Sequence, residues 1–207
     1  MKLLRVCSAI LCVVLFFSVF QFSGGAEVEK INNADLMPRW VPDDQVTVDE
    51  KGTPDWVKSL VMAQLRVESV SETGDFAGAI RVLDHYQEMG VNGIWLNPIY
   101  QRSDKNRRTI NNGYAATEPD MVDERIAGTK GKEEGWAAAR RFVDEAHARN
   151  IRVLLDIVVW GVDKTSPLVT QHPEWFQRNG EFINSWGNYG YNLDNADCRE
   201  WYIQNAV

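Results

Sequence analysis

The stretch IRVLLDIVV, residues 151–159, decides the fold class that the sequence predicts. It is almost wholly apolar, which is typical of a strand that is buried on both faces of a parallel sheet. One carboxylate, Asp156, interrupts the apolar run, which leads into Trp160 and Gly161. Because an unpaired buried carboxylate is costly, we expect Asp156 to have a hydrogen-bonding partner, either as plain structure or in support of a binding site.

The segments around this strand follow a regular order of strand-like and helix-like patterns. Short apolar runs predict strands, and apolar residues at helical spacing predict helices, with Asp75 as the N-cap of the first helix. The predicted strands are 59–67, 91–96 and 151–159, and the predicted helices are 75–90, 131–149 and 194–207. Strands that alternate with helices indicate βαβ units, so we expect an α/β fold with a parallel sheet.

Functional residues of such folds lie at the carboxyl ends of the strands. This rule brings Asn97, the polar loop 101–114, Trp160 and the irregular stretch 161–194 to one common face. The length of the loop 101–114 favours a functional role for it. Its charged residues are interpreted as those of a solvated surface loop.

The N-terminal residues 1–26 have the pattern of a signal peptide. Lys2 and Arg5 precede an apolar run over 6–22, and small residues follow that run as a cleavage site. We therefore expect export to the periplasm or the extracellular space. The alternative is an uncleaved membrane anchor, because the apolar run is just long enough to span a bilayer. Residues 27–56 are interpreted as an N-terminal arm or linker.

Charge and cysteine content exclude several classes of partner and site. The net charge is −7, and loss of Lys2 and Arg5 with the signal peptide would change it to −9. An acidic chain argues against nucleic acid as a partner, and against stable membrane association after signal cleavage. Cys198 is the only cysteine after residue 26, which excludes an internal disulfide and a cysteine-based metal site in the cleaved chain.

Aromatic residues are frequent in the two loops that follow the predicted strands. Tyr114 follows Gly113 in the first loop. The second loop and its approach hold Trp160, Trp175, Trp186, Tyr189 and Tyr191. Aromatic faces stack on sugar rings, so these residues favour a carbohydrate cleft, whereas burial in an aromatic core is the alternative. The sequence shows no metal-ligand spacing, no glycine-rich phosphate loop and no Gly-x-Ser-x-Gly elbow.

Four stretches together resemble the α-amylase family of glycoside hydrolases. They are DFAGAIRVLDHYQEMGVNGIWLNPIY (75–100), GYAATEPDMVDERIAGT (113–129), FVDEAHARNIRVLLDIVV (142–159) and HPEWF (172–176). The second is similar to the family's Gly-Tyr-Asp-x-x-Asp-Tyr loop and the Val-Asp-Pro-Arg-Phe-Gly-Thr segment after it. The third is similar to the family's approach to the third strand. The resemblance covers residues 57–207.

The resemblance implies an α/β fold that forms the first three strand–helix units of a TIM (β/α)8 barrel, with a loop insertion after strand 3. It also implies a retaining hydrolase or transglycosylase acting on α-linked glucans or oligosaccharides, which needs a carboxylate nucleophile and a carboxylic acid. The family supplies these groups from later strands, so we assign no catalytic residue and expect a truncated barrel that is inactive alone. Tyr114 matches the tyrosine that stacks on the sugar, and Asp156 matches an aspartate that supports the active site.

Several positions depart from the family motifs. Trp160 and Gly161 stand where the motif Asp-x-Val-x-Asn-His has its Asn and His, and Ala115, Glu118 and Pro119 replace the usual Asp, Asp and Tyr of the preceding loop. The family Asn is often a calcium ligand, so its replacement argues against calcium, and no other cofactor is expected. Trp160 is kept as a candidate substrate contact. The alternative function is a catalytically degenerate member that binds carbohydrate or a partner.

Overall fold

The computed structural model describes residues 46–103 and 113–206, and all the described elements belong to one compact unit. The predicted signal peptide, residues 1–26, lies outside the described residues, as do residues 27–45 of the predicted arm and residues 104–112 of the polar loop. Within the described ranges, no helix has the length and apolar character that crossing a membrane requires.

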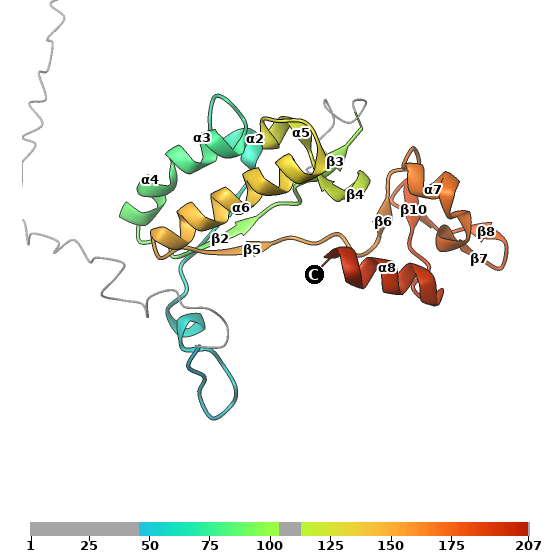
Figure 1. The fold of residues 1–207 in the computed structure, drawn as a ribbon. Helices are drawn as coiled ribbons and strands as arrows, with labels where there is room; N and C mark the ends of the chain where they lie inside the picture. Colours follow the sequence, from blue (N-terminus) through green and yellow to red (C-terminus); the bar gives the residue numbers. More distant parts are fainter. Residues whose placement is uncertain (1–45, 104–112, 207) are drawn as a thin grey trace, which may run out of the picture. The chain divides into compact units, whose positions relative to one another are not determined.

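A parallel three-stranded sheet organises the first part of the chain (Figure 1). Its strands are β1 (Met62–Leu65), β2 (Gly93–Leu96) and β5 (Arg152–Leu155). The strand order is β1-β2-β5, and Leu96 lies between Leu65 and Leu155 in the register. The carboxyl ends of the three strands therefore share one edge. The predicted α/β fold with a parallel sheet is confirmed.

Helical turns replace the two ends of the first predicted strand. The 3-10 helix η2 (Asp55–Ser59) precedes β1, and α2 (Val67–Val70) follows it. The buried Asn92 joins this segment to β2: its Oδ1 accepts a hydrogen bond from the amide of Val61 at 2.8 Å, and its Nδ2 donates to the carbonyl of Ser59 at 3.0 Å. One side-chain amide thus satisfies a donor and an acceptor where strand pairing stops.

Three helices cover one face of the sheet (Figure 1). They are α3 (Phe76–Arg81), α4 (Leu83–Glu88) and α6 (Lys132–Ala148). Asp75 is the N-cap of α3 as predicted, and its carboxylate accepts a hydrogen bond from the amide of Gly78 at 2.8 Å. The single helix predicted over 75–90 is divided at Val82. The core between helices and sheet includes Phe76, Leu83, Ile94, Ile126, Phe142 and Ile151.

The opposite face of the sheet is open in the described structure. Met62, Trp95 and Leu154 are 45%, 41% and 37% exposed, whereas Ile94 is buried against the helices. The expectation that strand 151–159 is buried on both faces is therefore wrong. Helices α3 and α6 pack on one face only, and the described chain supplies no cover for the other.

An antiparallel pair of strands, absent from the sequence prediction, flanks the polar loop. Strand β3 (Tyr100–Arg102) pairs with β4 (Ala116–Val122), and the short helix α5 (Glu124–Ala127) follows. Arg102 was expected to be a solvated charge of the loop. It is only 8% exposed, because it lies within an ion-pair network that is described below.

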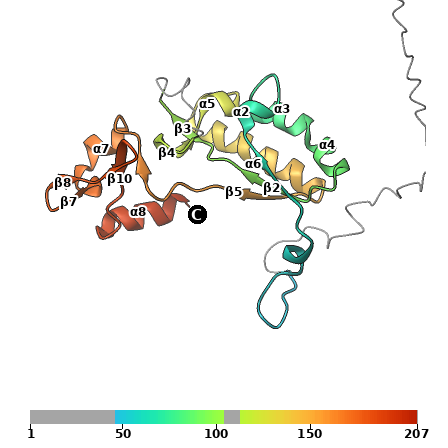
Figure 2. The same ribbon diagram turned by 180° about the vertical axis from the view of Figure 1, so that it is seen from behind.

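The stretch 161–194, predicted to be irregular, forms short helices and strands (Figure 2). These elements are β6 (Gly161–Val162), α7 (Pro167–Gln171), η4 (Pro173–Phe176), β7 (Gln177–Arg178), β8 (Glu181–Phe182), β9 (Asn184–Ser185) and β10 (Asn188–Gly190). An antiparallel sheet has the order β6-β10-β9, and β7 pairs with β8. The predicted final helix is confirmed as α8 (Ala196–Ala206). The core consists of Val162, Trp175, Phe176, Tyr191 and Cys198.

Candidate functional site

Tyr114 and Asp156 meet at the carboxyl edge of the parallel sheet. The Tyr114 hydroxyl donates a hydrogen bond of 2.5 Å to Asp156 Oδ2. Asp156 follows β5 directly, and its amide donates to the carbonyl of Leu96 at 2.9 Å, which extends the pairing of β2 and β5 by one residue. The carboxylate is half-buried at the strand end, rather than enclosed within a strand.

Gly113 explains how Tyr114 reaches this edge. Its φ is +93°, a conformation that favours glycine, and a Cβ atom at this position would lie 2.3 Å from the carbonyl oxygen of Pro98. The backbone before the tyrosine therefore passes against the segment that follows β2, closer than any side chain would allow. The Gly-Tyr pair is a geometric requirement of the site.

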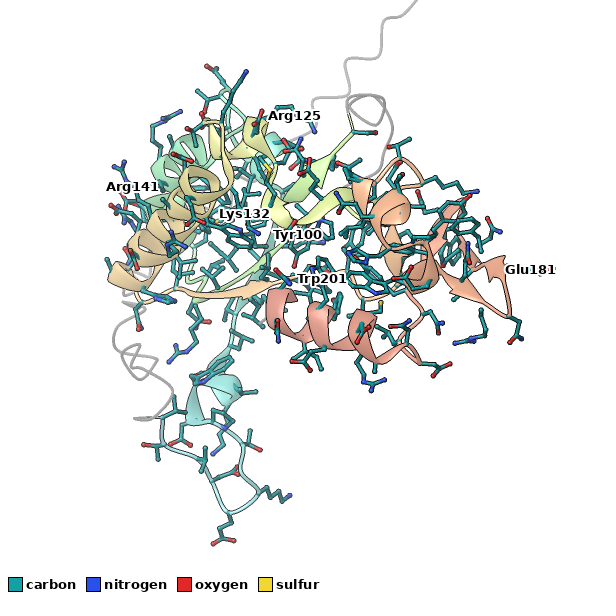
Figure 3. All side chains as sticks on the ribbon, turned by 45° about the vertical axis from the view of Figure 1, so that its right-hand side comes forward. Tyr100, Arg125, Lys132, Arg141, Glu181 and Trp201 are labelled. Carbon is teal, nitrogen blue, oxygen red and sulfur yellow. The ribbon has the colours of Figure 1, made fainter. Side chains whose placement is uncertain are left out.

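Tyr114 packs on a small aromatic cluster. Tyr100, Ala116 and Val158 are buried there, and Tyr114, Trp136 and Trp160 pack against them. Figure 3 shows Tyr100 on β3 and Trp201 on α8, which line one small pocket together. The sequence prediction missed Tyr100, because its position next to Pro98 and Ile99 reads only as the end of an apolar run.

The carboxylate of Asp156 affects the ionisation of both tyrosines. The hydrogen bond to Asp156, followed by burial and the negative charge of Asp156, raises the pKa of Tyr114 to about 12. Burial, followed by the charges of Tyr202 and Asp156, raises the pKa of Tyr100 to about 12. Both phenols therefore keep their protons well above neutral pH, and Tyr114 remains the donor to the carboxylate.

Trp160 and Gly161 connect the site to the second part of the chain. Trp160 is half-buried on the aromatic cluster, and its carbonyl accepts a hydrogen bond from the amide of Tyr191 at 3.1 Å. A Cβ atom on Gly161 would lie 2.0 Å from the carbonyl oxygen of Tyr189, because β6 pairs closely with β10. The backbone therefore leaves no room for a histidine at residue 161.

A second polar contact lies at the same edge of the sheet. Gln64 Nε2, in β1, donates to Asn97 Oδ1, just after β2, at 2.9 Å. Asn97 was expected on this face, whereas Gln64 was missed. The signal that could have identified Gln64 is a polar residue one position before the end of an apolar strand.

A buried ion-pair network supports the β3–β4 pair that flanks Tyr114. Asp123 is fully buried; its Oδ2 lies 2.5 Å from Arg125 Nη2 and 3.3 Å from Arg102 Nε. Arg102 also pairs with Glu68 of α2 at 2.8 Å. Burial alone would raise the pKa of Asp123, but the Arg125 hydrogen bond and the charges of both arginines lower it overall. The network therefore holds a carboxylate ionised inside the fold.

Most of the aromatic residues expected in a cleft belong to a core instead. Trp175 and Tyr191 are buried between α8 and the short strands. Tyr189 is partly buried and stacks on Phe182 with 4.3 Å between ring centroids. Of the predicted set, Tyr114 and Trp160 lie together, whereas Trp186 lies apart on the β9–β10 turn.

No candidate metal centre is found in the described part of the chain: His, Cys, Asp and Glu form no group of three or more that could hold an ion. The two helix histidines, His85 and His147, lie in α4 and α6. The third, His172, stacks on Trp175 with 3.9 Å between ring centroids. The HPEWF stretch therefore serves packing.

Comparison with known proteins identifies a consistent set of relatives. The family model "Alpha amylase, catalytic domain" matches residues 42–206. The chain is 31% identical to trehalose synthase from Thermus thermophilus over 156 residues and 30% identical to oligo-1,6-glucosidase from Heyndrickxia coagulans over 110 residues. These matches cover 72% and 51% of this chain but only 13% and 18% of the two relatives.

The fold agrees with that result. An α-amylase from Lactobacillus plantarum aligns with a TM-score of 0.62 and 25% identity, over 72% of this chain and 36% of that chain. The parallel sheet β1-β2-β5 and its helices thus correspond to part of an α-amylase catalytic domain. Since the family model also matches most of the sequence, the chain belongs to the α-amylase family of glycoside hydrolases.

Proposed function

We propose that residues 57–207 form the N-terminal portion of a TIM barrel that binds α-linked glucans or oligosaccharides. The observation that carries this proposal is the hydrogen bond between Tyr114 and Asp156 at the carboxyl edge of the parallel sheet. Barrel enzymes build their active sites at that edge. Family membership supports the substrate class.

In this proposal Tyr114 stacks on one glucosyl ring, and Asp156 fixes the tyrosine. A neutral phenol offers an aromatic face to the C–H groups of a pyranose. Its hydroxyl is held by the carboxylate, so little rotamer freedom remains to be lost on binding. Trp160, which packs on the same cluster, is proposed as a further substrate contact.

The chemistry proposed for the intact parent protein is retaining hydrolysis or transglycosylation. Both reactions need a carboxylate nucleophile and a carboxylic acid about 5 Å apart. We assign neither role to a residue of this chain. We propose no cofactor, and the replacement of the family's Asn by Trp160 argues against calcium. The pattern of residues 1–26 supports export to the periplasm or the extracellular space.

A second candidate function is carbohydrate or partner binding without catalysis. It is favoured by Gly161, where the neighbouring carbonyl of Tyr189 leaves no space for the family histidine. The parent protein distinguishes the two candidates, because only an enzyme would release glucose or transfer glucosyl units from maltotriose. A parent that binds maltotriose and leaves it intact would favour the second candidate.

The binding proposal is tested by titrating the complete chain with maltotriose and following its NMR spectrum. Tyr114→Ala should weaken binding by about tenfold or more, because the stacking surface is lost. Tyr114→Phe keeps the ring and should lose less. Asp156→Asn should weaken binding as well, while Asp194→Asn, an equal change at an exposed carboxylate, should not. Unchanged affinity in Tyr114→Ala, or no binding by the unmodified chain, would contradict the proposal.

A further inference from the structure

Trp186 is exposed to an extent that packing does not explain. It is 92% exposed, whereas the next most exposed tryptophan of the described residues, Trp95, is 41% exposed. Tryptophan carries the largest apolar surface of any side chain, so leaving it in water is unfavourable. The folded structure of the described residues gains almost nothing from this ring.

The backbone at this position does not favour tryptophan either. Ser185 pairs with Asn188, so Trp186 and Gly187 form the two-residue connection between β9 and β10. Their φ angles are +51° and +82°, as in the hairpin turns that prefer Asn-Gly. A bulky residue is uncommon in the left-handed region. Both solvent exposure and local conformation therefore disfavour the residue that is present.

The residues next to Trp186 in the turn, Ser185, Gly187 and Asn188, are small or polar and carry no charge. Asn188 Nδ2 donates to the carbonyl of Trp186 at 3.3 Å. Lys164, which follows β6, contacts Asn184 Oδ1 at 3.1 Å and lies 4.9 Å from the ring centroid of Tyr189, so these two residues engage its charge. Tyr189 also stacks on Phe182. Tyr189 and Phe182 thus pack against each other, whereas the indole of Trp186 is exposed to solvent.

We propose that Trp186 is a stacking platform for a pyranose ring of an α-glucan, so that the β9–β10 turn is a second carbohydrate contact in addition to Tyr114. The side-chain amides of Asn184 and Asn188 and the hydroxyl of Ser185 can form hydrogen bonds with sugar hydroxyls. The ligand class rests on the proposed function. The exposure of Trp186 and the conformation of its turn do not depend on Tyr114.

The chemistry favours a neutral sugar over other occupants. Hot spots of protein interfaces lie in well-packed pockets from which water is excluded, whereas Trp186 stands on a two-residue turn between Ser185 and Asn188. A membrane surface attracts basic segments with several apolar residues, whereas this chain is acidic, with a net charge of −7. One aromatic face beside amides is sufficient for a sugar ring.

The experiment uses the complete chain and maltoheptaose, with affinity measured by calorimetry and melting temperature measured in parallel. Trp186→Asn should lower the affinity for maltoheptaose by about fivefold to tenfold, because the ring is lost. It should leave the melting temperature unchanged or higher, because asparagine suits the left-handed turn. Trp186→Phe keeps an aromatic face and should retain most of the affinity. Maltotriose, which is shorter, should respond less to Trp186→Asn than to Tyr114→Ala.

The outcomes separate this inference from the proposed function. Loss of affinity in Trp186→Asn but not in Tyr114→Ala would support this site and contradict the proposed one. The reverse result would overturn this inference alone. A lower melting temperature with unchanged affinity would assign Trp186 a structural role and overturn the inference. So would a change confined to self-association or vesicle binding, measured by sedimentation.

Discussion

The two parts of the described chain, residues 55–155 and residues 161–206, are stabilised in different ways. The first has strands that pair in parallel and a largely aliphatic core under three helices. The second has strands of two or three residues, and its core is dominated by aromatic rings. Trp175 and Trp201 lie 5.5 Å apart by ring centroids, as do Phe176 and Tyr191.

This difference shows two ways in which the fold stabilises the segments around the candidate site. Repeated strand–helix units fix the sheet edge where Asp156 lies. Residues 161–206 are held together mainly by a few large side chains, because their short strands form few backbone hydrogen bonds with one another. We expect the second part to depend more strongly on single residues, and to open more readily, than the first.

The largest expected effect comes from a matched pair of core substitutions. Phe142→Ala and Phe176→Ala each remove a fully buried ring, one from each part, and each should lower the free energy of unfolding by about 4 kcal/mol. Urea unfolding followed by circular dichroism measures this. Hydrogen exchange should show that Phe176→Ala releases the amides of residues 161–206 first. Equal release of both parts would contradict the comparison.

Asp123→Ala tests the polar support of the first part. Removing this buried carboxylate leaves Arg102 with Glu68 as its one remaining carboxylate partner, takes the ion pair from Arg125, and should lower the free energy of unfolding by about 3 kcal/mol. Asp194→Ala, which removes an exposed partner of Arg178, is the control and should have almost no effect.

The same variant has a defined pH dependence. The pKa of Asp123 is lowered in the folded state, so its contribution is present above the ordinary value of 3.8 and is lost as the pH falls through the lower folded pKa. The difference in stability between the unmodified chain and Asp123→Ala should therefore be constant above pH 3.8 and should shrink as the pH falls below that value. A difference that is constant down to strongly acidic pH would argue against an ionised carboxylate.

Gly161→His tests the connection between the two parts. The added Cβ atom would meet the carbonyl of Tyr189, so β6 must separate from β10, at a loss of about 1–3 kcal/mol. Gly180→Asn is the control, because nothing lies within 4 Å of a Cβ there and asparagine tolerates its positive φ. Thermal unfolding measures both variants. A stable Gly161→His protein with stronger maltotriose binding would contradict our interpretation of the departure at this residue.

The smallest expected effect is on the ionisation of Tyr114. Its pKa is raised to about 12 by Asp156, so at pH 10, the ordinary pKa, it should remain almost fully protonated. The stabilisation from this hydrogen bond is present below pH 10 and is lost as the pH rises to about 12. Phenolate absorption at pH 10 should increase in Asp156→Asn relative to the unmodified chain. The double variant Tyr114→Phe/Asp156→Asn should cancel that increase, which assigns the signal to Tyr114.

The sequence predicted the features that depend on local pattern. The parallel sheet, the N-cap Asp75 and helix α6 each follow from residues that are close together in the chain. The common face of Tyr114 and Asp156 could also be predicted, because carboxyl ends of parallel strands share an edge.

The predictions that were wrong concern residues whose environment depends on partners distant in the sequence. Arg102 is buried because Asp123 and Glu68 reach it from other elements. Trp175 and Tyr191 became core residues because α8 packs on them, which no periodicity in residues 161–194 indicates. The open face of the sheet could not be predicted either, since an apolar run alone does not show whether one or both faces of its strand are covered.

Gly161 also limits the mutational paths open to this protein. A single substitution to the histidine of the family motif would place a side chain against the backbone of Tyr189. Histidine at residue 161 would first require a change in the pairing of β6 with β10. The backbone of the neighbouring strand therefore makes glycine at residue 161 hard to replace one substitution at a time.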